Sequence, residues 1–391
     1  MELFRKTQID FLGPKWYFIT VSVIAIAISA ISLLTRGLTY GIDFRGGADV
    51  VLRFVEDPAI DEVRSALEHG SFGGAQIQKL RLPEDPTAHD LLVRVPPQGG
   101  NDETPGEEKD VSGLVLAALR SGLAAKTAAE GKLDLNLSGA VEIKKALLDS
   151  HPGQESMASA AASLIADYRN ANGGLLKSVD EAVSISGVPA EAVSWLRANA
   201  VVGGYTIRSV DYVGPSVGKE LKSKATYAII GSLFAMLAYI WFRFERLSFG
   251  VSAILTLAHD ALLALGAVSL TGKEFDLTVL AAILTIVGYS VNDTIVIFDR
   301  VRENLSHRRT GDLQKLFNES INQTLGRTIL TSLLVLMVVL TLWLFGGSRL
   351  NPFSFTLLVG VISGTYSTIY ISAPIVIWME QLKAKRAPVR G

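Results

Sequence analysis

The chain has 391 residues, a net charge of −1, no cysteine and a hydrophobic content of 49%. The balanced charge gives no global basic signal for nucleic-acid binding, and the missing cysteines exclude disulfides and thiolate metal sites. The five histidines are scattered without a pair at helical ligand spacing, so we expect no metal and no other cofactor. The apolar composition with only 19% charged residues instead favours a membrane protein.

Six segments are long and apolar enough to cross a bilayer as helices. The first exceeds the apolar core of a typical signal peptide and follows a tail at 1–15, so we interpret it as an uncleaved anchor. The predicted spans are roughly 16–34, 225–242, 250–270, 277–298, 328–345 and 355–379.

The basic residues predict the orientation of these spans. Lysines and arginines gather in the tail 1–15, after the second span, in the loop 299–327 and in the tail 380–391. Six spans place all four regions on one side, which the positive-inside rule identifies as cytoplasmic. Both termini are therefore expected in the cytoplasm. The polar part of the loop, about 300–326, is expected to form a surface helix near anionic lipid.

The segment 35–224 is then expected outside the cytoplasm, as a small α+β domain. After a glycine-rich turn at 41–47, alternating residues predict strands at 48–54, 76–82, 91–95 and 205–213, with a helix at 59–69. From about 96 to 200 we expect a mostly helical insertion, for which the sequence indicates no function. Its predicted elements are helices at 111–126, 141–148, 157–168, 175–183 and 189–199 and a short strand at 134–138.

Asp260 is the most informative residue, because it lies near the middle of the third span. An ionised carboxylate facing lipid at that depth costs about 2.5–3.5 kcal/mol, so it should face another helix or a wet cavity. Two roles remain open for it. It can be a proton carrier that is neutralised during a transport cycle, or a structural hydrogen-bond acceptor between helices.

Polar and small residues also interrupt the fourth span. Gly288 and Asn292 share one helix face, and Gly288 would let another helix approach closely, so a polar seam between the third and fourth helices is expected. Asn292 and Asp293 have a second explanation as residues that bridge backbone groups near the interface. Asp299 and Arg300 fit a solvated pair at the membrane edge.

The last span carries Gly360 and Gly364 at the spacing that favours tight helix packing. Thr365 and Thr368 follow them. Their hydroxyl groups either belong to the same packing or hydrate a cavity around Asp260.

No enzymatic activity is expected. Residues 214–220, GPSVGKE, are similar to a phosphate loop, but the glycines are one residue too close and Glu220 follows Lys219 where a hydroxyl residue is required. The sequence also lacks the HExxH and GxSxG motifs of two hydrolase classes.

Four motifs occur in order along the chain: GIDFRGG at 41–47, VDYVGPSVGKEL at 210–221, AHD at 258–260 and VGYSVNDTIVIFDRVREN at 287–304. Together they resemble the SecF family of Sec translocase membrane subunits. The resemblance implies a ferredoxin-like exported domain and a relation to proton-driven transporters of the resistance–nodulation–division type. It also implies use of the proton gradient, with SecD, to pull preproteins outward across the bacterial cytoplasmic (inner) membrane. The implied partners are SecD, the channel proteins SecY, SecE and SecG, a YajC-like subunit, preproteins and membrane lipid, but no nucleic acid.

Carried over by position, the resemblance makes Asp260 and Arg300 candidates for the proton pathway, with Asn292 and Asp293 beside them. The chain departs from the expected pattern in the stretch 96–200, which is expected to be absent from typical members and to serve a partner particular to this lineage. Two rival classes stay open. One is an exporter of small molecules or lipids from the same superfamily, and the other is a structural subunit that moves no protons.

Overall fold

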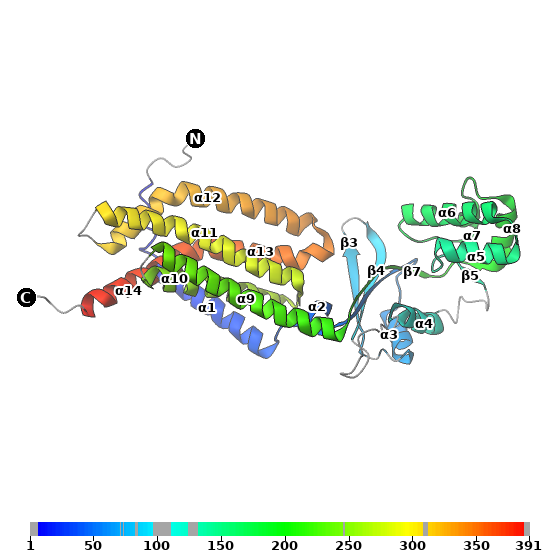
Figure 1. Cartoon of the computed structure of the whole chain (residues 1–391), viewed down its shortest axis with the longest axis horizontal. Helices are drawn as coiled ribbons and strands as arrows, with labels where there is room; N and C mark the ends of the chain where they lie inside the picture. The colour runs from blue at the N-terminus through cyan, green and yellow to red at the C-terminus, as the bar shows by residue number, and fades with distance from the viewer. Residues whose placement is uncertain are drawn as a thin grey trace, which may run out of the picture. The chain divides into compact units, whose positions relative to one another are not determined.

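The computed structural model describes residues 7–70, 72, 74–82, 85–96, 111–123, 132–244, 247–307 and 312–386. The chain divides into two compact units. One unit joins Met1–Phe44 to Glu220–Gly391, and the other is Arg45–Lys219. Figure 1 shows that the first is a helical bundle and the second combines a sheet with helices.

Six helices of the bundle are long and apolar enough to span a membrane, counted over the described residues. The central helices α10, α11 and the last span bury about half of their apolar windows, whereas α1, α9 and α12 expose most of theirs. The spans are α1 (Lys15–Thr35), α9 (Pro215–Phe244), α10 (Leu247–Thr271), α11 (Leu277–His307), α12 (Leu313–Phe345) and a last span formed by α13 (Gly347–Ser367), the π-helix η2 (Thr368–Ser372) and α14 (Ala373–Arg386).

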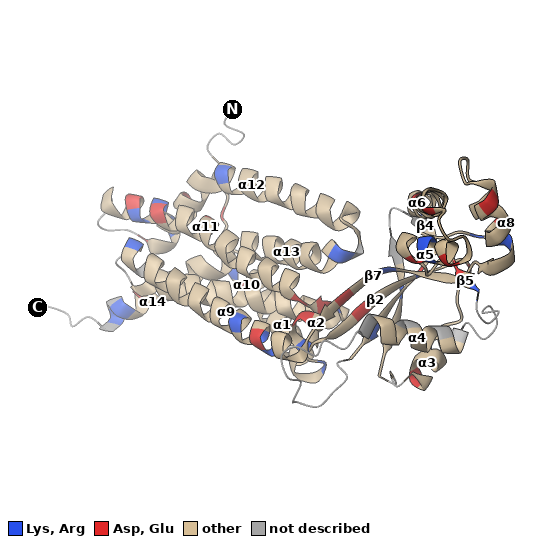
Figure 2. Cartoon of the chain, turned by 45° about the vertical axis from the view of Figure 1, so that its right-hand side comes forward, with Lys and Arg blue, Asp and Glu red and all other residues tan. Residues whose placement is uncertain are grey.

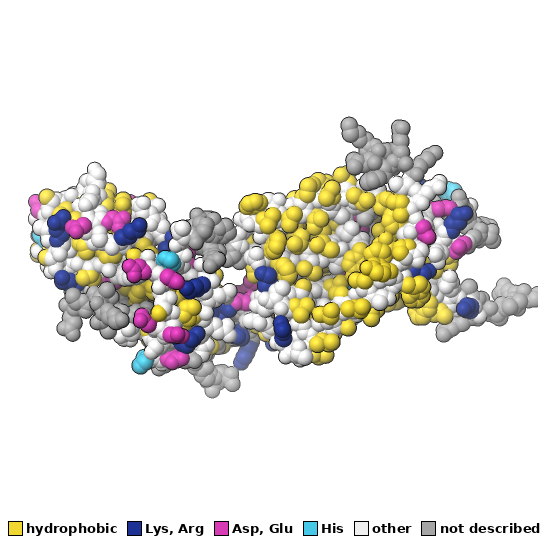
Figure 3. Space-filling view, turned by 180° about the vertical axis from the view of Figure 1, so that it is seen from behind, with side chains coloured by type: hydrophobic (Ala, Val, Ile, Leu, Met, Phe, Trp, Pro, Cys, Tyr) yellow, Lys and Arg dark blue, Asp and Glu magenta, His cyan; other side chains and the backbone are white. Residues whose placement is uncertain are grey.

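The surface of the bundle exposes apolar side chains, as expected for a protein that contacts lipid. Figure 3 shows hydrophobic side chains covering one face of the bundle, and Figure 2 shows charged residues gathered toward the ends of its helices. Long exposed apolar side chains such as Phe234, Leu334 and Val338 would be costly in water. The chain is therefore a multi-pass membrane protein.

Short elements close the bundle at one end. Strand β1 (Thr39–Tyr40), which follows α1, pairs in parallel with β8 (Glu274–Phe275) between α10 and α11. The one-turn helix α2 (Ile42–Arg45) lies at the junction of the two units. Gly46 and Gly47 follow with φ values of 74° and 122°, which explains why glycines stand there in the predicted turn.

The expected surface helix at 300–326 is wrong. Its residues continue the fourth and fifth spans, because α11 runs on to His307 and α12 already begins at Leu313. Asp312 caps α12 by accepting a hydrogen bond from the backbone N–H of Gln314 at 2.9 Å. Both helices therefore continue past the membrane edge into their polar segments, because solvated polar residues are compatible with a helix.

The second unit contains a four-stranded antiparallel sheet in the order β3-β4-β2-β7. Its strands match the predicted segments, although β4 begins earlier than expected. One face of β2 buries Val50, Leu52 and Phe54 against α3 (Ile60–His69) and α4 (Val111–Leu123). The strands are β2 (Gly47–Phe54), β3 (Gln76–Leu82), β4 (Asp85–Val95) and β7 (Tyr205–Val213).

Helix α4 belongs to the core of this sheet and not to the helical insertion, so the expected start of the insertion near residue 96 is wrong. Val115 and Leu119 of α4 are fully buried in the same cluster as α3. A Cβ atom at Gly122 would lie 2.2 Å from the Cβ of Ala66, so the two helices cross closely. The apolar spacing of 111–126 is correct for a helix but does not specify which core receives it.

The remaining helices form a module with its own hydrophobic core. Two helical hairpins, α5–α6 and α7–α8, turn near Gly153 and Gly187, whose φ values of 88° and 95° favour glycine. The elements are β5 (Leu133–Asp134), α5 (Ala140–Ser150), α6 (Glu155–Ala171), α7 (Val179–Val183), α8 (Ala190–Asn199) and β6 (Ala200–Val201), which pairs in parallel with β5.

Asn136 ties three segments of this module together. Its side chain is buried, and Nδ2 donates to the carbonyl oxygens of Leu176 at 3.0 Å and Gly203 at 2.7 Å. Its Oδ1 accepts from the backbone N–H of Leu176 at 2.8 Å. Asn136 therefore satisfies three backbone groups that the module buries.

Asn136→Ala should lower the free energy of unfolding of the unit Arg45–Lys219 by about 1–3 kcal/mol, because it leaves buried backbone groups unsatisfied. Hydrogen exchange of the full chain in detergent should show lost protection at Leu176. Asn199→Ala is the control, since Asn199 is exposed and bonds only locally to Trp195. Equal protection in both variants would contradict the assigned role.

Candidate functional site

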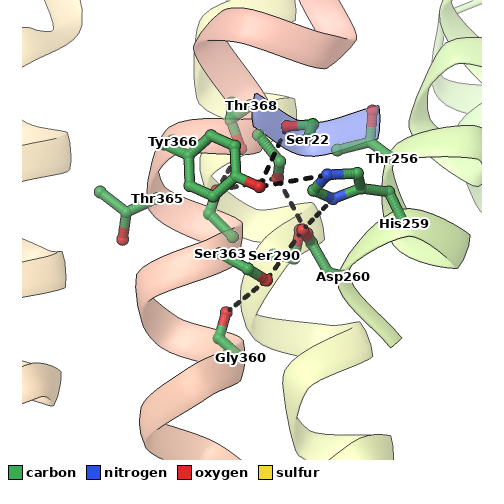
Figure 4. Close-up of polar contacts among 12 residues, drawn as sticks. Ser22, Thr256, His259, Asp260, Ser290, Gly360, Ser363, Thr365, Tyr366 and Thr368 are labelled. Carbon is green, nitrogen blue, oxygen red and sulfur yellow. Dashed lines mark hydrogen bonds and ion pairs between the residues drawn. The ribbon is translucent and has the colours of Figure 1, made fainter. Parts of the chain in front are cut away.

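Asp260 lies in α10 with none of its surface exposed, and its carboxylate accepts four hydrogen bonds (Figure 4). Oδ1 accepts hydrogen bonds from His259 Nδ1 and from Ser363 Oγ, each at 2.9 Å. Oδ2 accepts hydrogen bonds from Ser290 Oγ at 2.6 Å and from Ser367 Oγ at 2.9 Å. The donors come from α10, α11 and α13, so the three central helices meet at this side chain.

Four donors match the acceptor capacity of an ionised carboxylate, which offers about four lone-pair positions on two oxygens. Bonds of this kind compensate the desolvation of a charge that would otherwise be costly inside an apolar bundle. The arrangement therefore satisfies Asp260 between helices with side-chain donors alone. It meets the sequence prediction that the carboxylate faces partner helices.

The polar contacts continue beyond His259. Its Nε2 lies 3.2 Å from the hydroxyl oxygen of Tyr366, and the two rings are edge to face. That oxygen in turn accepts a hydrogen bond from Ser22 Oγ at 3.1 Å. The chain of contacts thus runs from Asp260 through α10 and α13 to α1, as Figure 4 shows.

Two glycines of α13 make this meeting of helices possible. A Cβ atom at Gly360 would lie 2.2 Å from Ile286 Cδ1, and one at Gly364 would lie 3.3 Å from Ser290 Cβ. Glycine at these positions lets α13 approach α11 closely, in the way its small-residue spacing predicts. The approach brings Ser363 of α13 within hydrogen-bond distance of Asp260.

Gly288 and Asn292 do not take part in this site. Both are exposed, and a Cβ atom at Gly288 would meet no described atom within 4 Å. The predicted close approach at Gly288 is therefore wrong for contacts within this chain. The seam between α10 and α11 is formed by Ser290 instead, because a shift of two residues turns the side chain to the α10 side.

Asp293 contacts α12, whereas Ser290 contacts α10. Asp293 is buried, and its Oδ2 accepts from Ser332 Oγ of α12 at 3.2 Å, while Asn292 Nδ2 lies 3.4 Å from Oδ1. This contact joins side chains of two helices, whereas the second explanation given for Asp293 expects a bridge to backbone groups. Within the described residues Asp293 and Asp260 have no hydrogen-bond partner in common, so the two carboxylates occupy separate polar sites.

Arg300 lies near the end of α11 and does not reach Asp260. Its guanidinium donates to Glu303 at 2.5 Å and to Gln323 at 2.6 Å. Asp299, expected as its partner, pairs instead with Arg243 at 2.7 Å. Among the described residues, no group of three or more histidine and acidic side chains could hold a metal ion.

The threonines named from the sequence are not the partners of Asp260. Thr365 donates to the carbonyl of Val361, and Thr368 donates to that of Gly364. Ser363 and Ser367 bond Asp260 instead, in the position that was expected for the threonines. The sequence offers a signal that these serines lie near the packing face, because each stands three residues after a glycine of the packing pair. Nothing in the sequence marks Ser22 or Tyr366 as part of the site.

A buried, fully bonded carboxylate at the centre of six membrane helices, joined to a separate α+β unit, defines a multi-pass membrane protein with an ionisable intramembrane site. The family model described as "Protein export membrane protein SecD/SecF, C-terminal" matches residues 196–382. The "SecD/SecF GG Motif" model matches residues 31–57.

Relatives match nearly the whole chain. The protein translocase subunit SecF of Koribacter versatilis is 39% identical, over 99% of this chain and 95% of the relative. That of Desulfurispirillum indicum is 36% identical, over 96% of this chain and 92% of the relative. The chain belongs to the SecF family of protein translocase subunits.

Solved structures agree with this family. The crystal structure of SecDF from Thermus thermophilus, described as a translocon-associated membrane protein, is 29% identical and matches 96% of this chain with a TM-score of 0.66. SecDF in a super-membrane-facing form matches 98% with a TM-score of 0.56. This chain spans about two fifths of those longer chains, at 39% and 40%.

The expectation that typical members lack the stretch 96–200 does not hold for two relatives. The two family models leave 58–195 unmatched, but the alignments with the Koribacter and Desulfurispirillum relatives cover 96–99% of this chain. The helical module is therefore a feature that these relatives share.

Gly360→Leu should destabilise the bundle by at least about 1–3 kcal/mol, because its side chain overlaps Ile286 in a packed core. Loss of helical circular dichroism on titration with sodium dodecyl sulfate measures the effect. Gly231→Leu is the control, since Gly231 is an exposed helical glycine in α9 with no described atom within 4 Å of an added Cβ. Equal sensitivity of the two variants would contradict close packing at Gly360.

Proposed function

We propose that this chain works with SecD in the bacterial cytoplasmic membrane, where the pair uses the proton gradient to drive late-stage preprotein export. Asp260 is the proposed proton carrier. The observation that carries the proposal is the complete burial of Asp260 where three central helices meet. Family membership supports the role in Sec translocation, and the proposed activity is transport without enzymatic chemistry.

The serines around Asp260 offer a way to couple protonation to helix packing. Ser363 Oγ lies 3.4 Å from the carbonyl oxygen of Gly360, and Ser367 Oγ lies 3.3 Å from that of Gly364. Each hydroxyl therefore has a second acceptor in its own helix. When Asp260 is protonated it accepts fewer bonds, and these hydroxyls turn to the backbone, which loosens the link between α10 and α13.

The energy available is sufficient for such a change. A proton that crosses about 150 mV releases about 3.5 kcal/mol, at about 2.3 kcal/mol per 100 mV. This free energy shifts a two-state equilibrium by more than about a hundredfold. One proton per cycle is therefore enough to bias the bundle between two helix arrangements.

The proposed exported unit is Arg45–Lys219, in the orientation that the basic residues favour. Its element order, with α3 after β2 and α4 after β4, and its strand order β3-β4-β2-β7 support the ferredoxin-like βαββαβ fold that we propose for it. Helix α9 begins at Pro215, directly after β7 and Gly214, and continues as one helix through its span. We propose that α9 transmits the change in the bundle to this unit.

The exposed face of α11 supports SecD as the partner within the membrane. Thr285, Gly288 and Asn292 share this face and are exposed, although a polar amide at that depth favours a partner helix over lipid. We propose that a SecD helix covers it. The channel proteins SecY, SecE and SecG, a YajC-like subunit and preproteins complete the proposed assembly.

Gly288→Leu should reduce the amount of SecD that co-purifies with this chain, because the added side chain holds the partner helix away. Gly231→Leu on α9 should leave the yield unchanged. The measurement is the ratio of the two subunits after mild detergent extraction. An unchanged ratio for Gly288→Leu would remove α11 as the SecD contact.

Asp260→Asn should abolish the part of translocation that the proton gradient drives, because the amide cannot exchange a proton, while Asp260→Glu should keep some of it. Preprotein translocation is followed in inverted membrane vesicles from which ATP is removed mid-transport, before a proton gradient is applied. Asp10→Asn, at an exposed carboxylate, is the control. Asp293→Asn, Asn292→Ala and Arg300→Ala test the weaker candidates in the same assay.

Equal completion by the wild type and Asp260→Asn would instead identify Asp260 as a structural acceptor. The chain would then be a scaffold for its complex, which is the rival that the four hydrogen bonds also accommodate.

A further inference from the structure

We propose that Asp260 exchanges its proton with the cytoplasmic side along His259, Tyr366 and Ser22, so that His259 and Tyr366 are relay residues. The inference rests on the proposed function of Asp260 as a proton carrier and specifies the route that the proton takes. It depends on an uninterrupted series of hydrogen bonds that links α10, α13 and α1 (Figure 4).

The chemistry of the groups sets the direction of these bonds. An ionised carboxylate only accepts hydrogen bonds, so His259 Nδ1 carries the hydrogen that points to Asp260. In a neutral ring Nε2 is then an acceptor and takes the hydroxyl hydrogen of Tyr366. Ser22 donates to the oxygen of Tyr366. All three hydrogens therefore point toward Asp260, as expected after a proton has left it.

The opposite state satisfies the same atoms. Protonated Asp260 donates to a bare Nδ1, Nε2–H donates to Tyr366, and Tyr366 donates to Ser22. Release shifts one proton along each bond: from Asp260 to Nδ1, from Nε2 to the Tyr366 oxygen, from that hydroxyl to Ser22, and from Ser22 to a water molecule that reaches it when the link between α10 and α13 loosens. Asp260 becomes negative, one hydronium ion forms, and His259, Tyr366 and Ser22 stay neutral.

The other neighbours of Asp260 do not continue such a path. Ser363 and Ser367 have backbone carbonyls as their second partners, and a carbonyl oxygen has no proton to pass on. Within the part of the chain that the structure describes, His259 is the only hydrogen-bond partner of Asp260 that bonds a further proton-exchanging side chain.

The position of Ser22 assigns the side of the membrane. Ser22 lies in the N-terminal half of α1 (Lys15–Thr35), toward the tail that the basic residues place in the cytoplasm. It is 2% exposed, and His259 is 5% exposed, so bulk water does not replace the relay at these two positions. The path is therefore the cytoplasmic release branch for protons that enter from outside.

The test measures proton uptake by proteoliposomes that contain the complex with SecD, with a pH-sensitive dye inside and an imposed gradient. Tyr366→Phe removes one hydroxyl and keeps the ring, and it should slow uptake at least about tenfold. His259→Asn keeps an N–H donor for Asp260 but cannot relay, so it should slow uptake as strongly. A residue that merely orients Asp260 would tolerate this exchange.

Tyr370→Phe is the matched control, because Tyr370 lies one turn further along the same span and stacks on Phe18 at 3.7 Å outside the relay. Its uptake should equal that of the wild type. Uptake by the wild type should also be slower in D2O than in water, since the proposed step moves protons in line. This last measurement decides the question if a substituted complex does not assemble.

The outcomes separate this inference from the function on which it rests. If Asp260→Asn abolishes uptake while Tyr366→Phe and His259→Asn retain the wild-type rate, the relay is wrong and Asp260 remains the carrier. If Asp260→Asn retains full uptake, the proposed function fails and the relay fails with it. Equal wild-type rates in D2O and water would also overturn the relay.

Discussion

The bundle is organised by one constraint, namely that a carboxylate deep among apolar helices must have all of its acceptor positions occupied. In water the solvent meets this requirement, but inside the bundle only side chains from other helices can do so. Asp260 obtains its bonds from His259 and from serines of α11 and α13, and each bond fixes the rotation of the helix that supplies it. One acidic side chain thereby sets the register of three spans.

The glycines of α13 follow from this constraint. A serine hydroxyl reaches only a short distance from its helix axis, so the backbones of α11 and α13 must lie close together before both can touch the same carboxylate. Gly360 permits this approach because any side chain there would overlap Ile286. The hydrogen bonds and the close packing are thus two parts of the same solution, which differs from packing driven by apolar contact alone.

The sequence predicts the six spans, the strands and the position of Asp260 against other helices, because hydropathy and alternation are local properties of the chain. It does not predict which face of a neighbouring helix meets Asp260. Gly288 and Asn292 attract attention by composition, yet the rotation of α11 presents Ser290 instead. Likewise α4 has an obvious helical pattern, but only the tertiary fold assigns it to the core of α3.

The π-helix η2 has a consequence for how the last span faces α10. Its Thr368–Ser372 segment follows directly on Ser367, which bonds Asp260, and ends at Ser372, whose carbonyl accepts from Ser252 of α10 at 2.7 Å. The wider turn separates the angular phase of α13 from that of α14. The last span can therefore turn both Ser367 and Ser372 toward α10, although five residues of a regular α-helix would place them on different faces.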